Sequence, residues 1–349
     1  MGARATGDFS KNILDVRIDL SKKGDPRKSF DQAMGELVKR DPRVFLLTAD
    51  MGTVVPTFRR DHKDRVLNFG IAEQNMIGAA AGLALCGKIP FVTTMSCFIS
   101  MRACEQVRTD VAYPCLNVKF FGFGCGVTYG NLASTHHATE DIGIMRSIPH
   151  MTVVCPAGPV ETYKAVLAAA EYPGPVFIRA GRGDESVIYD SDYPFQIGKA
   201  IALRDGKDVA VFAIGITVSR ALAAAEELEK EGIRCRVVNM HTLKPLDRKM
   251  VIAAATGVKG VITVEDHNIY GGLGSAVAEV LAEEKLGPLK RIGIPDLFCT
   301  IGTPDQILEK HQVSVAEIKR AARRFCKGLE RRKTEKSSPV KGKGKKGRS

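Results

Sequence analysis

The sequence predicts an α/β protein built of two doubly wound domains with parallel sheets. Apolar stretches of strand length alternate with segments of helical spacing from about residue 30 to residue 180, which is typical of a parallel sheet flanked by helices. A Gly- and Pro-marked stretch at 183–200 interrupts this alternation, which then starts again. The 349 residues are enough for two such domains with sizeable cores.

The first domain is expected over 27–182, after an N-terminal arm over 1–26. Phe30, Met34 and Leu37 recur at helical spacing, so a helix opens the domain. Strands are then expected at 43–50, 89–94, 118–124, 151–156 and 175–179, with helices near 73–86, 95–108 and 160–170. Asp50 ends the first strand, where ligands of open α/β sheets gather, although an Asp here also suits the cap of the next turn.

The second domain is expected over 201–327, after a linker over 183–200. Its pattern gives strands at 208–215, 235–240 and 261–266, with helices at 217–231 and from 271 to about 284. The glycines at 271, 272 and 274 lack the spacing of a dinucleotide fingerprint and come late in the domain, so a Rossmann assignment is excluded.

The net charge of +12 is concentrated near the C-terminus. Residues 327–349 hold ten Lys or Arg against two Glu, which leaves about +4 for the rest of the chain. We expect a disordered basic tail over 328–349, because it offers almost nothing apolar to pack. A nucleic-acid-binding arm is the less favoured interpretation of this tail.

Cysteine and hydropathy patterns exclude several classes of protein. The nine cysteines stand singly with no C-x-x-C pair, so their spacing indicates neither a zinc site nor a disulfide framework. No apolar run approaches the ~18 residues of a membrane helix, and the N-terminus does not read as a secretory signal. His136 and His137 have no evident third metal ligand. We expect a cytoplasmic protein without a metal site of its own.

One carboxylate stands where burial makes it costly. Glu73 follows the stretch 68–72 and opens a helix of small and apolar residues over 77–85. A buried carboxylate must be protonated or hydrogen-bonded. Taken alone, Glu73 suits the first turn of a helix as a capping acid, whereas its setting favours a ligand.

The stretch Asn68–Met76 resembles the F-G-I-x-E-Q motif of the transketolase family of thiamine-diphosphate enzymes. Further similarities follow in the family's order: the aminopyrimidine-side helix at 98–106, the substrate loop at 135–149, and C-terminal domain motifs at 237–247 and 265–275. The resemblance covers about residues 28–325. It implies a pyrimidine-binding domain followed by a transketolase C-terminal-like domain.

The resemblance also implies the roles of individual residues. Glu73 would contact N1′ of the cofactor's aminopyrimidine as the catalytic acid, Phe98 would stack on this ring, and Arg102 and Asp50 would lie beside the cofactor. His136 matches a family histidine, with a catalytic and substrate-binding role at the hydroxyls of the donor sugar.

One arginine of the family holds the phosphate of the substrate, a task suited to a fork of donors. Arg179 and Arg182 both match it, and their spacing leaves the choice open. Charges at the surface end of a strand are the alternative interpretation for both.

The family's G-D-G…N motif, which holds the diphosphate through magnesium, is not found. Gly183-Asp184 is followed by Glu185, and the next Asn is Asn239. We therefore expect the pyrimidine-side subunit of a split transketolase, with thiamine diphosphate and magnesium held jointly with a second, diphosphate-binding subunit in an α2β2 assembly. The expected reaction transfers a two-carbon ketol unit between phosphorylated sugars or their close relatives.

Three departures from the family pattern bear on specificity. Met95 and Met101 replace aromatic residues that often line the cofactor pocket, and Leu132 replaces an Asp that selects the configuration of the donor hydroxyls within an E-D-G-P sequence. Rival interpretations are a 2-oxo acid dehydrogenase β chain, a deoxyxylulose-phosphate synthase-like subunit, and a non-catalytic scaffold that binds partners through its tail. The His136 loop favours a ketol transferase, and the presence of Glu73 and Phe98 argues against a scaffold.

Overall fold

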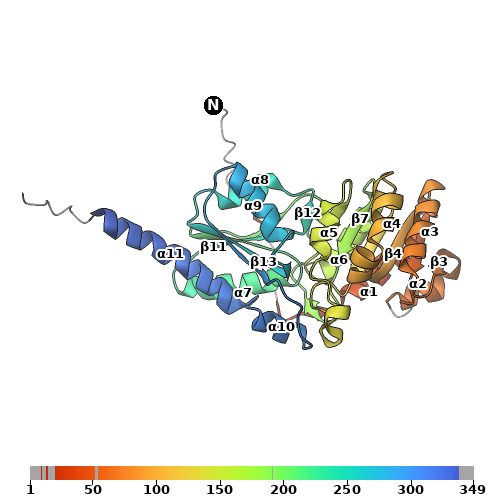
Figure 1. Cartoon of the computed structure of the whole chain (residues 1–349), viewed down its shortest axis with the longest axis horizontal. Coiled ribbons are helices and arrows are strands. Elements are labelled where there is room, and N and C mark those ends of the chain that lie inside the picture. The colour runs from red at the N-terminus through yellow and green to blue at the C-terminus, as the bar shows by residue number, and fades with distance from the viewer. Residues whose placement is uncertain (1–8, 10–12, 15–19, 52–53, 191, 338–349) are drawn as a thin grey trace, which may run out of the picture.

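The computed structural model describes residues 9, 13–14, 20–51, 54–190 and 192–337. Two α/β units lie side by side, the N-terminal one at one end of the molecule and the C-terminal one at the other (Figure 1). Helix α11 projects from the C-terminal unit (Figure 1). No described helix has the length and apolar character needed to cross a membrane.

The first unit is built on a seven-stranded sheet in the order β12-β6-β7-β5-β4-β2-β3. Neighbouring strands are parallel except at the β12 edge. The strands are β2 (Val44–Thr48), β3 (Val66–Asn68), β4 (Ile89–Met95), β5 (Lys119–Phe123), β6 (Thr152–Val154), β7 (Val176–Arg179) and β12 (Thr242–Lys244). β12 comes from the second half of the chain, so it ties the two units together.

Helices cover both faces of this sheet. One face carries α1 (Pro26–Arg40) and α6 (Pro159–Glu171), where the ring of Phe30 stacks on Phe121 at a centroid distance of 4.0 Å. The other carries α3 (Glu73–Leu85), α5 (Asp141–Ser147) and the π-helical segment η4 (Val107–Ala112). Short helical segments complete the unit: α2 (Pro56–Asp61), η2 (Lys63–Arg65), η3 (Phe98–Arg102), α4 (Cys104–Gln106) and η5 (Gly130–Thr135).

The second unit has a five-stranded sheet in the order β14-β13-β10-β11-β9, parallel except at the β9 edge. Its strands are β9 (Ile201–Arg204), β10 (Val209–Ala213), β11 (Cys235–Asn239), β13 (Gly260–Asn268) and β14 (Leu289–Ile294). α7 (Thr217–Lys230) and α11 (Val315–Ser337) pack on one face, α8 (Arg248–Ala255) and α9 (Leu273–Glu283) on the other. The short helix α10 is Pro304–Lys310.

These sheets confirm the expected pair of doubly wound domains. The sequence pattern does not predict the antiparallel edges β9 and β12, because each is short and depends on pairing with a strand distant in sequence. The stretch 183–200 is more than a linker. It contributes β8 (Glu185–Ser186), which pairs with β1 (Lys23–Gly24), and buries Ile188, Tyr189 and Tyr193.

The two ends of the chain also differ from expectation. The expected N-terminal arm packs on the second unit where it is described: Phe9 is buried, and Ile13 bridges to Ala202. At the other end, α11 continues to Ser337, so residues 328–337 are helical rather than disordered. The reason is a run of Leu, Glu, Arg and Lys, all good helix formers, with no proline before Pro339. The remaining part of the expected tail, 338–349, lies outside the described residues.

Candidate active site

Glu73 is the first residue of α3, at the carboxyl-end edge of the larger sheet. Gly70 makes the turn out of β3 with a left-handed φ of 64°, which favours glycine. The Glu73 residue is only 2% exposed. Such burial is tolerable at the N-terminus of a helix, where the helix dipole favours a negative charge, provided the carboxylate also has hydrogen-bond donors.

Arg102 supplies those donors. Its Nη1 lies 2.9 Å from both Oε1 and Oε2 of Glu73. The Arg102 side chain is 43% exposed, whereas that of Glu73 is 3% exposed, so the pair opens to solvent on the arginine side. Among the described residues the carboxylate is thus held by this side chain, not by a capping contact to its own helix turn.

Phe98 lies beneath the same guanidinium. The Cζ atom of Arg102 is 3.9 Å from the centroid of the Phe98 ring. Both residues belong to η3, a π-helical segment that closely follows β4, and such segments are frequent at functional sites. One flat cation therefore contacts the buried acid and the aromatic face together.

Three more side chains extend this arrangement. The Phe98 and His136 rings meet edge to face at 5.4 Å, His136 stacks with Tyr129 at 5.3 Å, and the Cζ atom of Arg182 lies 4.0 Å from the Tyr129 centroid. We call this contiguous set the site row: Glu73, Arg102, Phe98, His136, Tyr129 and Arg182. The sequence does not single out Tyr129, whose only signal there is an aromatic residue in a Gly-rich loop.

His136 is arranged as a neutral hydrogen-bond acceptor. Burial, together with the positive charge of Arg102, lowers its pKa. The Thr135 hydroxyl donates to the carbonyl of Leu132, and its oxygen lies 2.9 Å from Nδ1 of His136. With the hydroxyl proton on the Leu132 carbonyl, Nδ1 would carry the hydrogen and donate to Thr135, and the Nε2 lone pair would remain for a ligand hydroxyl.

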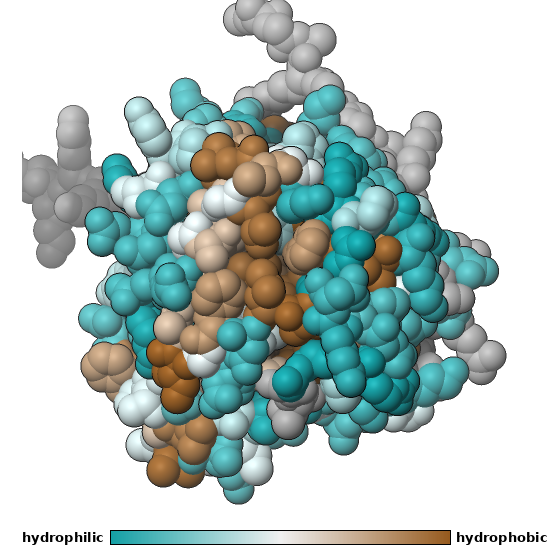
Figure 2. Space-filling view, turned by 90° about the vertical axis from the view of Figure 1, so that its right-hand side faces the viewer, coloured by the Kyte–Doolittle hydropathy of each residue, from teal (hydrophilic) through white to brown (hydrophobic). Residues whose placement is uncertain are grey.

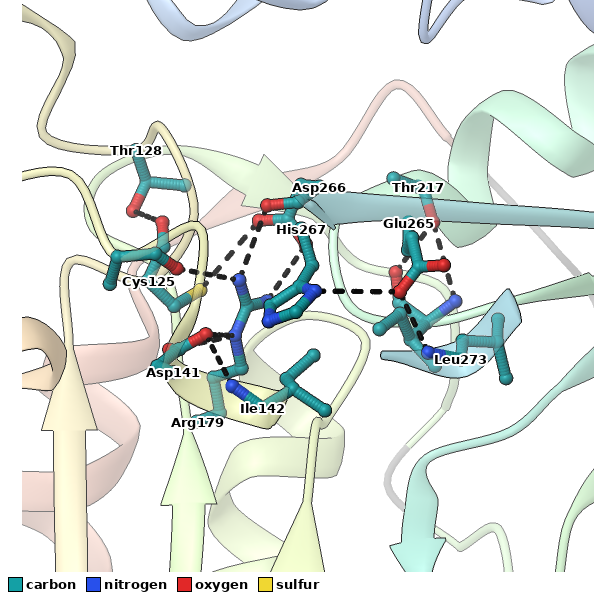
Figure 3. A network of polar contacts seen from close by, with 12 residues as sticks. Cys125, Thr128, Asp141, Ile142, Arg179, Thr217, Glu265, Asp266, His267 and Leu273 are labelled. Atoms are coloured by element: carbon teal, nitrogen blue, oxygen red, sulfur yellow. Dashed lines mark hydrogen bonds and ion pairs between the residues drawn. The ribbon is translucent and has the colours of Figure 1, made fainter. Parts of the chain in front are cut away.

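Arg179 lies apart from the site row. It is fully buried where the two units meet, with Nε 2.9 Å from both carboxylate oxygens of Asp141 and Nη1 2.8 Å from Oδ1 of Asp266 (Figure 3). Its Nη2 donates to the carbonyls of Ala138 and Asp266. With its donors committed inside the protein, Arg179 is not disposed to bind a substrate phosphate. Of the two arginines that the sequence leaves open, the half-buried Arg182 lies in the site row.

Asp50 lies at the margin of the site row, and so do Met95, Met101 and Leu132, the three residues that depart from the family pattern. Asp50 is exposed just beyond β2 with a left-handed φ of 53°, and its N–H donates to Oδ1 of Asn68 at 3.2 Å. Since β2 and β3 are parallel, Asp50 shares the sheet edge with the turn before Glu73. Met101 and Leu132 are partly exposed, whereas Met95 is buried.

The row fits a flat aromatic ring that bears ring nitrogens and an amino group. A guanidinium, itself flat and rich in N–H donors, already contacts both the Glu73 carboxylate and the Phe98 face. An aminopyrimidine presents the same combination of a π face and polar nitrogens. Fold and site together define an α/β protein with a buried carboxylate and an aromatic ring beside it at the edge of its first sheet.

Comparison with known proteins agrees with this fold and identifies the family. Residues 22–185 match the transketolase pyrimidine binding domain, and residues 198–318 match the transketolase C-terminal domain. The chain therefore belongs to the transketolase family.

Several relatives cover most of the chain. It is 41% identical over 298 residues to a 6-deoxy-6-sulfo-D-fructose transketolase subunit of Clostridium sp. (strain MSTE9), covering 85% of this chain and 92% of the relative. It is 38% identical over 304 residues to an apulose-4-phosphate transketolase subunit of Phocaeicola vulgatus, covering 86% and 97%. Against human transketolase it is 39% identical over 282 residues but spans only 45% of that protein.

A solved structure shows the same fold. The chain superimposes with a TM-score of 0.79 on a protein described as a split gene transketolase, inactive beta4 tetramer. The two are 39% identical, and the match covers 86% of this chain and 97% of the other.

Proposed function

We propose that this chain is the pyrimidine-binding subunit of a heteromeric transketolase that uses thiamine diphosphate to move a two-carbon ketol unit between phosphorylated sugars. The observation that carries the proposal is the buried Glu73 carboxylate, which shares one flat cationic partner with the Phe98 ring. Family membership supports the choice of cofactor. Relatives named as transketolase subunits support the division of the enzyme between two chains.

When bound, thiamine diphosphate supplies the electron sink for cleaving the carbon–carbon bond next to a ketose carbonyl. Glu73 would hold and exchange a proton at N1′ of the aminopyrimidine, and Phe98 would fix the plane of the ring. His136, with Nε2 as acceptor, would orient a donor hydroxyl. Arg182 would hold the substrate phosphate with its fork of N–H donors.

Arg102 has to move for this to happen. The guanidinium of Arg102 contacts Glu73 and Phe98, the same two groups that the aminopyrimidine ring requires. The guanidinium and the ring therefore cannot occupy this position at the same time. Because the side chain is already 43% exposed, it can turn toward solvent at small cost. Arg102 would then border the cofactor, with both Glu73 oxygens free for the ring.

A partner surface accompanies the site. Figure 2 shows an apolar area on the end of the molecule formed by the first unit. Ile71 and Leu85, at either end of α3, are 77% and 73% exposed, and Tyr113 is 85% exposed. An exposed apolar area such as the one in Figure 2 marks an interface. We propose that this end binds a second copy and the diphosphate-binding subunit, whose side chains would hold the diphosphate and magnesium.

The test is reconstitution. The purified chain would be mixed with a candidate subunit carrying a G-D-G…N motif, thiamine diphosphate and magnesium, and assayed for ketol transfer and for 2-oxo acid decarboxylation. Ketol transfer that requires both chains supports the proposal. Full activity of this chain alone, or decarboxylation without ketol transfer, would contradict it.

A further inference from the structure

Tyr129 lies in the middle of the site row, between His136 and Arg182. Its ring stacks with the His136 ring at a centroid distance of 5.3 Å and an interplanar angle of 22°, and the Cζ atom of Arg182 lies 4.0 Å from its centroid. In the proposed function His136 orients a donor hydroxyl and Arg182 holds the substrate phosphate. Tyr129 therefore contacts both of the groups that would hold the polar parts of a phosphorylated sugar.

Arg182 depends on this ring for its position. Among the residues that the structure describes, its guanidinium makes the contact with Tyr129 but no hydrogen bond or ion pair. A guanidinium over an aromatic face gains about 0.5–2 kcal/mol and keeps its N–H groups for another partner. The Tyr129 ring therefore orients Arg182 while leaving its hydrogen-bond donors available for an anion.

The hydroxyl of Tyr129 is available as well. The side chain is half-buried and packs against the hydrophobic core of the first unit, which accounts for its ring. The hydroxyl makes no hydrogen bond to a described residue and is not sealed from solvent. A phenylalanine would pack equally well, whereas a phenol can also donate and accept a hydrogen bond. The hydroxyl thus adds a polar group to the part of the row that holds His136 and Arg182.

Main-chain hydrogen bonds fasten the loop that carries Tyr129 to the two segments that carry its partners. The N–H of Gly126 donates to the Ala138 carbonyl at 3.1 Å, and the N–H of Ala138 donates back at 2.8 Å, two residues beyond the histidine. The N–H of Cys125 donates to the Ala180 carbonyl at 3.1 Å, two residues before the arginine. The tyrosine, the histidine and the arginine are therefore held near one another before any ligand binds.

We propose that Tyr129 determines substrate specificity: its ring positions Arg182 for the phosphate, and its hydroxyl binds a sugar hydroxyl between the group held by His136 and the phosphate. This inference rests on the proposed ketol transfer. It narrows the substrate to sugar phosphates that carry a further hydroxyl between the ketol end and the phosphate. A short ketol donor that lacks both this hydroxyl and the phosphate, such as hydroxypyruvate, would not use the Tyr129 hydroxyl.

The kinetic experiment uses the reconstituted enzyme with hydroxypyruvate and with two phosphorylated ketoses, xylulose 5-phosphate and fructose 6-phosphate. Tyr129→Phe keeps both stacks and removes only the hydroxyl, whereas Tyr129→Leu also removes the aromatic face beneath the guanidinium. Tyr270→Phe is the matched control, because it removes a hydroxyl from a 58% exposed tyrosine outside the site row. Circular dichroism would confirm that each variant is folded.

For the phosphorylated ketoses we expect kcat/KM to fall about twofold to tenfold in Tyr129→Phe, the effect of one neutral hydrogen bond. Loss of the cation–π contact should lower it by a further factor of about two to thirty in Tyr129→Leu. With hydroxypyruvate, Tyr129→Phe should have no effect and Tyr129→Leu a smaller one, and the control should match the unmodified enzyme throughout. Equal losses for both kinds of donor, no loss with the ketose phosphates, or turnover of hydroxypyruvate alone would overturn the proposal.

A second measurement needs neither cofactor, partner nor sugar: nitrogen NMR of the His136 ring in the full-length chain as a function of pH. Burial, and then the charge of Arg102, lower the pKa of His136. Removing the ring that covers it in Tyr129→Leu should raise this pKa toward its ordinary value, whereas Tyr129→Phe should leave it unchanged. An unchanged pKa in Tyr129→Leu would overturn the positioning role of the ring. Absence of ketol transfer by the unmodified enzyme would instead contradict the proposed function, so the two failures are distinguished.

Discussion

Two arginine–carboxylate clusters, one within the first unit and one between the two units, have nearly the same N···O distances and opposite surroundings. Arg102 meets Glu73 at 2.9 Å, and Arg179 meets Asp141 at 2.9 Å and Asp266 at 2.8 Å. The Arg102 side chain is 43% exposed, whereas all three side chains of the Arg179 cluster are completely buried. Distance alone therefore does not separate a site from a structural element; the exposure of the cation does.

The closed cluster joins the two units. Arg179 ends β7 of the first sheet, Asp266 lies on β13 of the second, and Asp141 opens α5 (Figure 3). Buried charges lose their hydration, and only complete pairing restores that loss. In the Glu73–Arg102 pair only the arginine is exposed: water can replace Glu73 as the partner of Arg102, whereas the buried Glu73 carboxylate needs another donor, such as a ring nitrogen of a bound ligand. It is the pair that can rearrange around a ligand.

The largest effect, on the free energy of unfolding, is expected when the buried cluster of Arg179, Asp141 and Asp266 loses its cation. Arg179→Gln would leave Asp141 and Asp266 buried without their cation, at a cost of about 3–5 kcal/mol in the free energy of unfolding. Denaturant unfolding measures it. Arg182→Gln is the matched control, the same change three residues away at a half-buried position, and should cost less than about 1 kcal/mol. Equal losses in the two variants would refute the distinction between them.

In the partly exposed Glu73–Arg102 pair, Glu73→Gln should lower turnover and leave folding nearly unchanged. Gln is nearly isosteric but cannot exchange a proton with N1′. Positioned acid–base groups contribute ~10²–10⁴-fold to rate. We expect kcat of the reconstituted enzyme to fall by this factor, with unfolding changed far less than in Arg179→Gln. Steady-state kinetics and denaturation of the same preparation decide it, and retained turnover would contradict the catalytic role.

Arg182→Gln sharpens the comparison between the neighbouring arginines. Hydrogen bonds to charged groups contribute about 1.5–3 kcal/mol, so losing this one should lower kcat/KM for a phosphorylated donor by roughly tenfold to a hundredfold. A donor without phosphate should be little affected. Equal losses for both donors would remove Arg182 from the phosphate.

The smallest effect is expected at Arg102. If it must turn aside for the cofactor, Arg102→Ala should keep the affinity of the reconstituted enzyme for thiamine diphosphate within about twofold, because a partly exposed ion pair contributes little. Fluorescence or calorimetric titration would measure this. A loss of tenfold or more would show that Arg102 is instead a direct ligand of the cofactor.

The central strands and the Glu73 helix were predictable because parallel strands buried on both faces are continuous apolar runs, and because Glu73 interrupts an apolar context. The difference in burial between Arg179 and Arg182 was not predictable. Burial of Arg179 depends on Asp141 and Asp266, which lie 38 and 87 residues away along the chain, and local spacing carries no trace of them. Tyr129 was missed for a similar reason, since an irregular loop has no periodicity from which the direction of a side chain follows.

The central claim is that Glu73 exchanges a proton with the cofactor ring, and it is tested most directly by hydrogen–deuterium exchange at C2 of thiamine diphosphate in the assembled enzyme. Exchange at C2 reports the effect of the acid on the ring before any sugar binds. We expect the Glu73→Gln enzyme to exchange ~10²–10⁴-fold more slowly than the unmodified enzyme, with cofactor affinity changed much less. Exchange at the unmodified rate in the Gln variant would mean that Glu73 only begins a helix. The proposed role of the Glu73–Arg102 pair in cofactor binding would then be wrong.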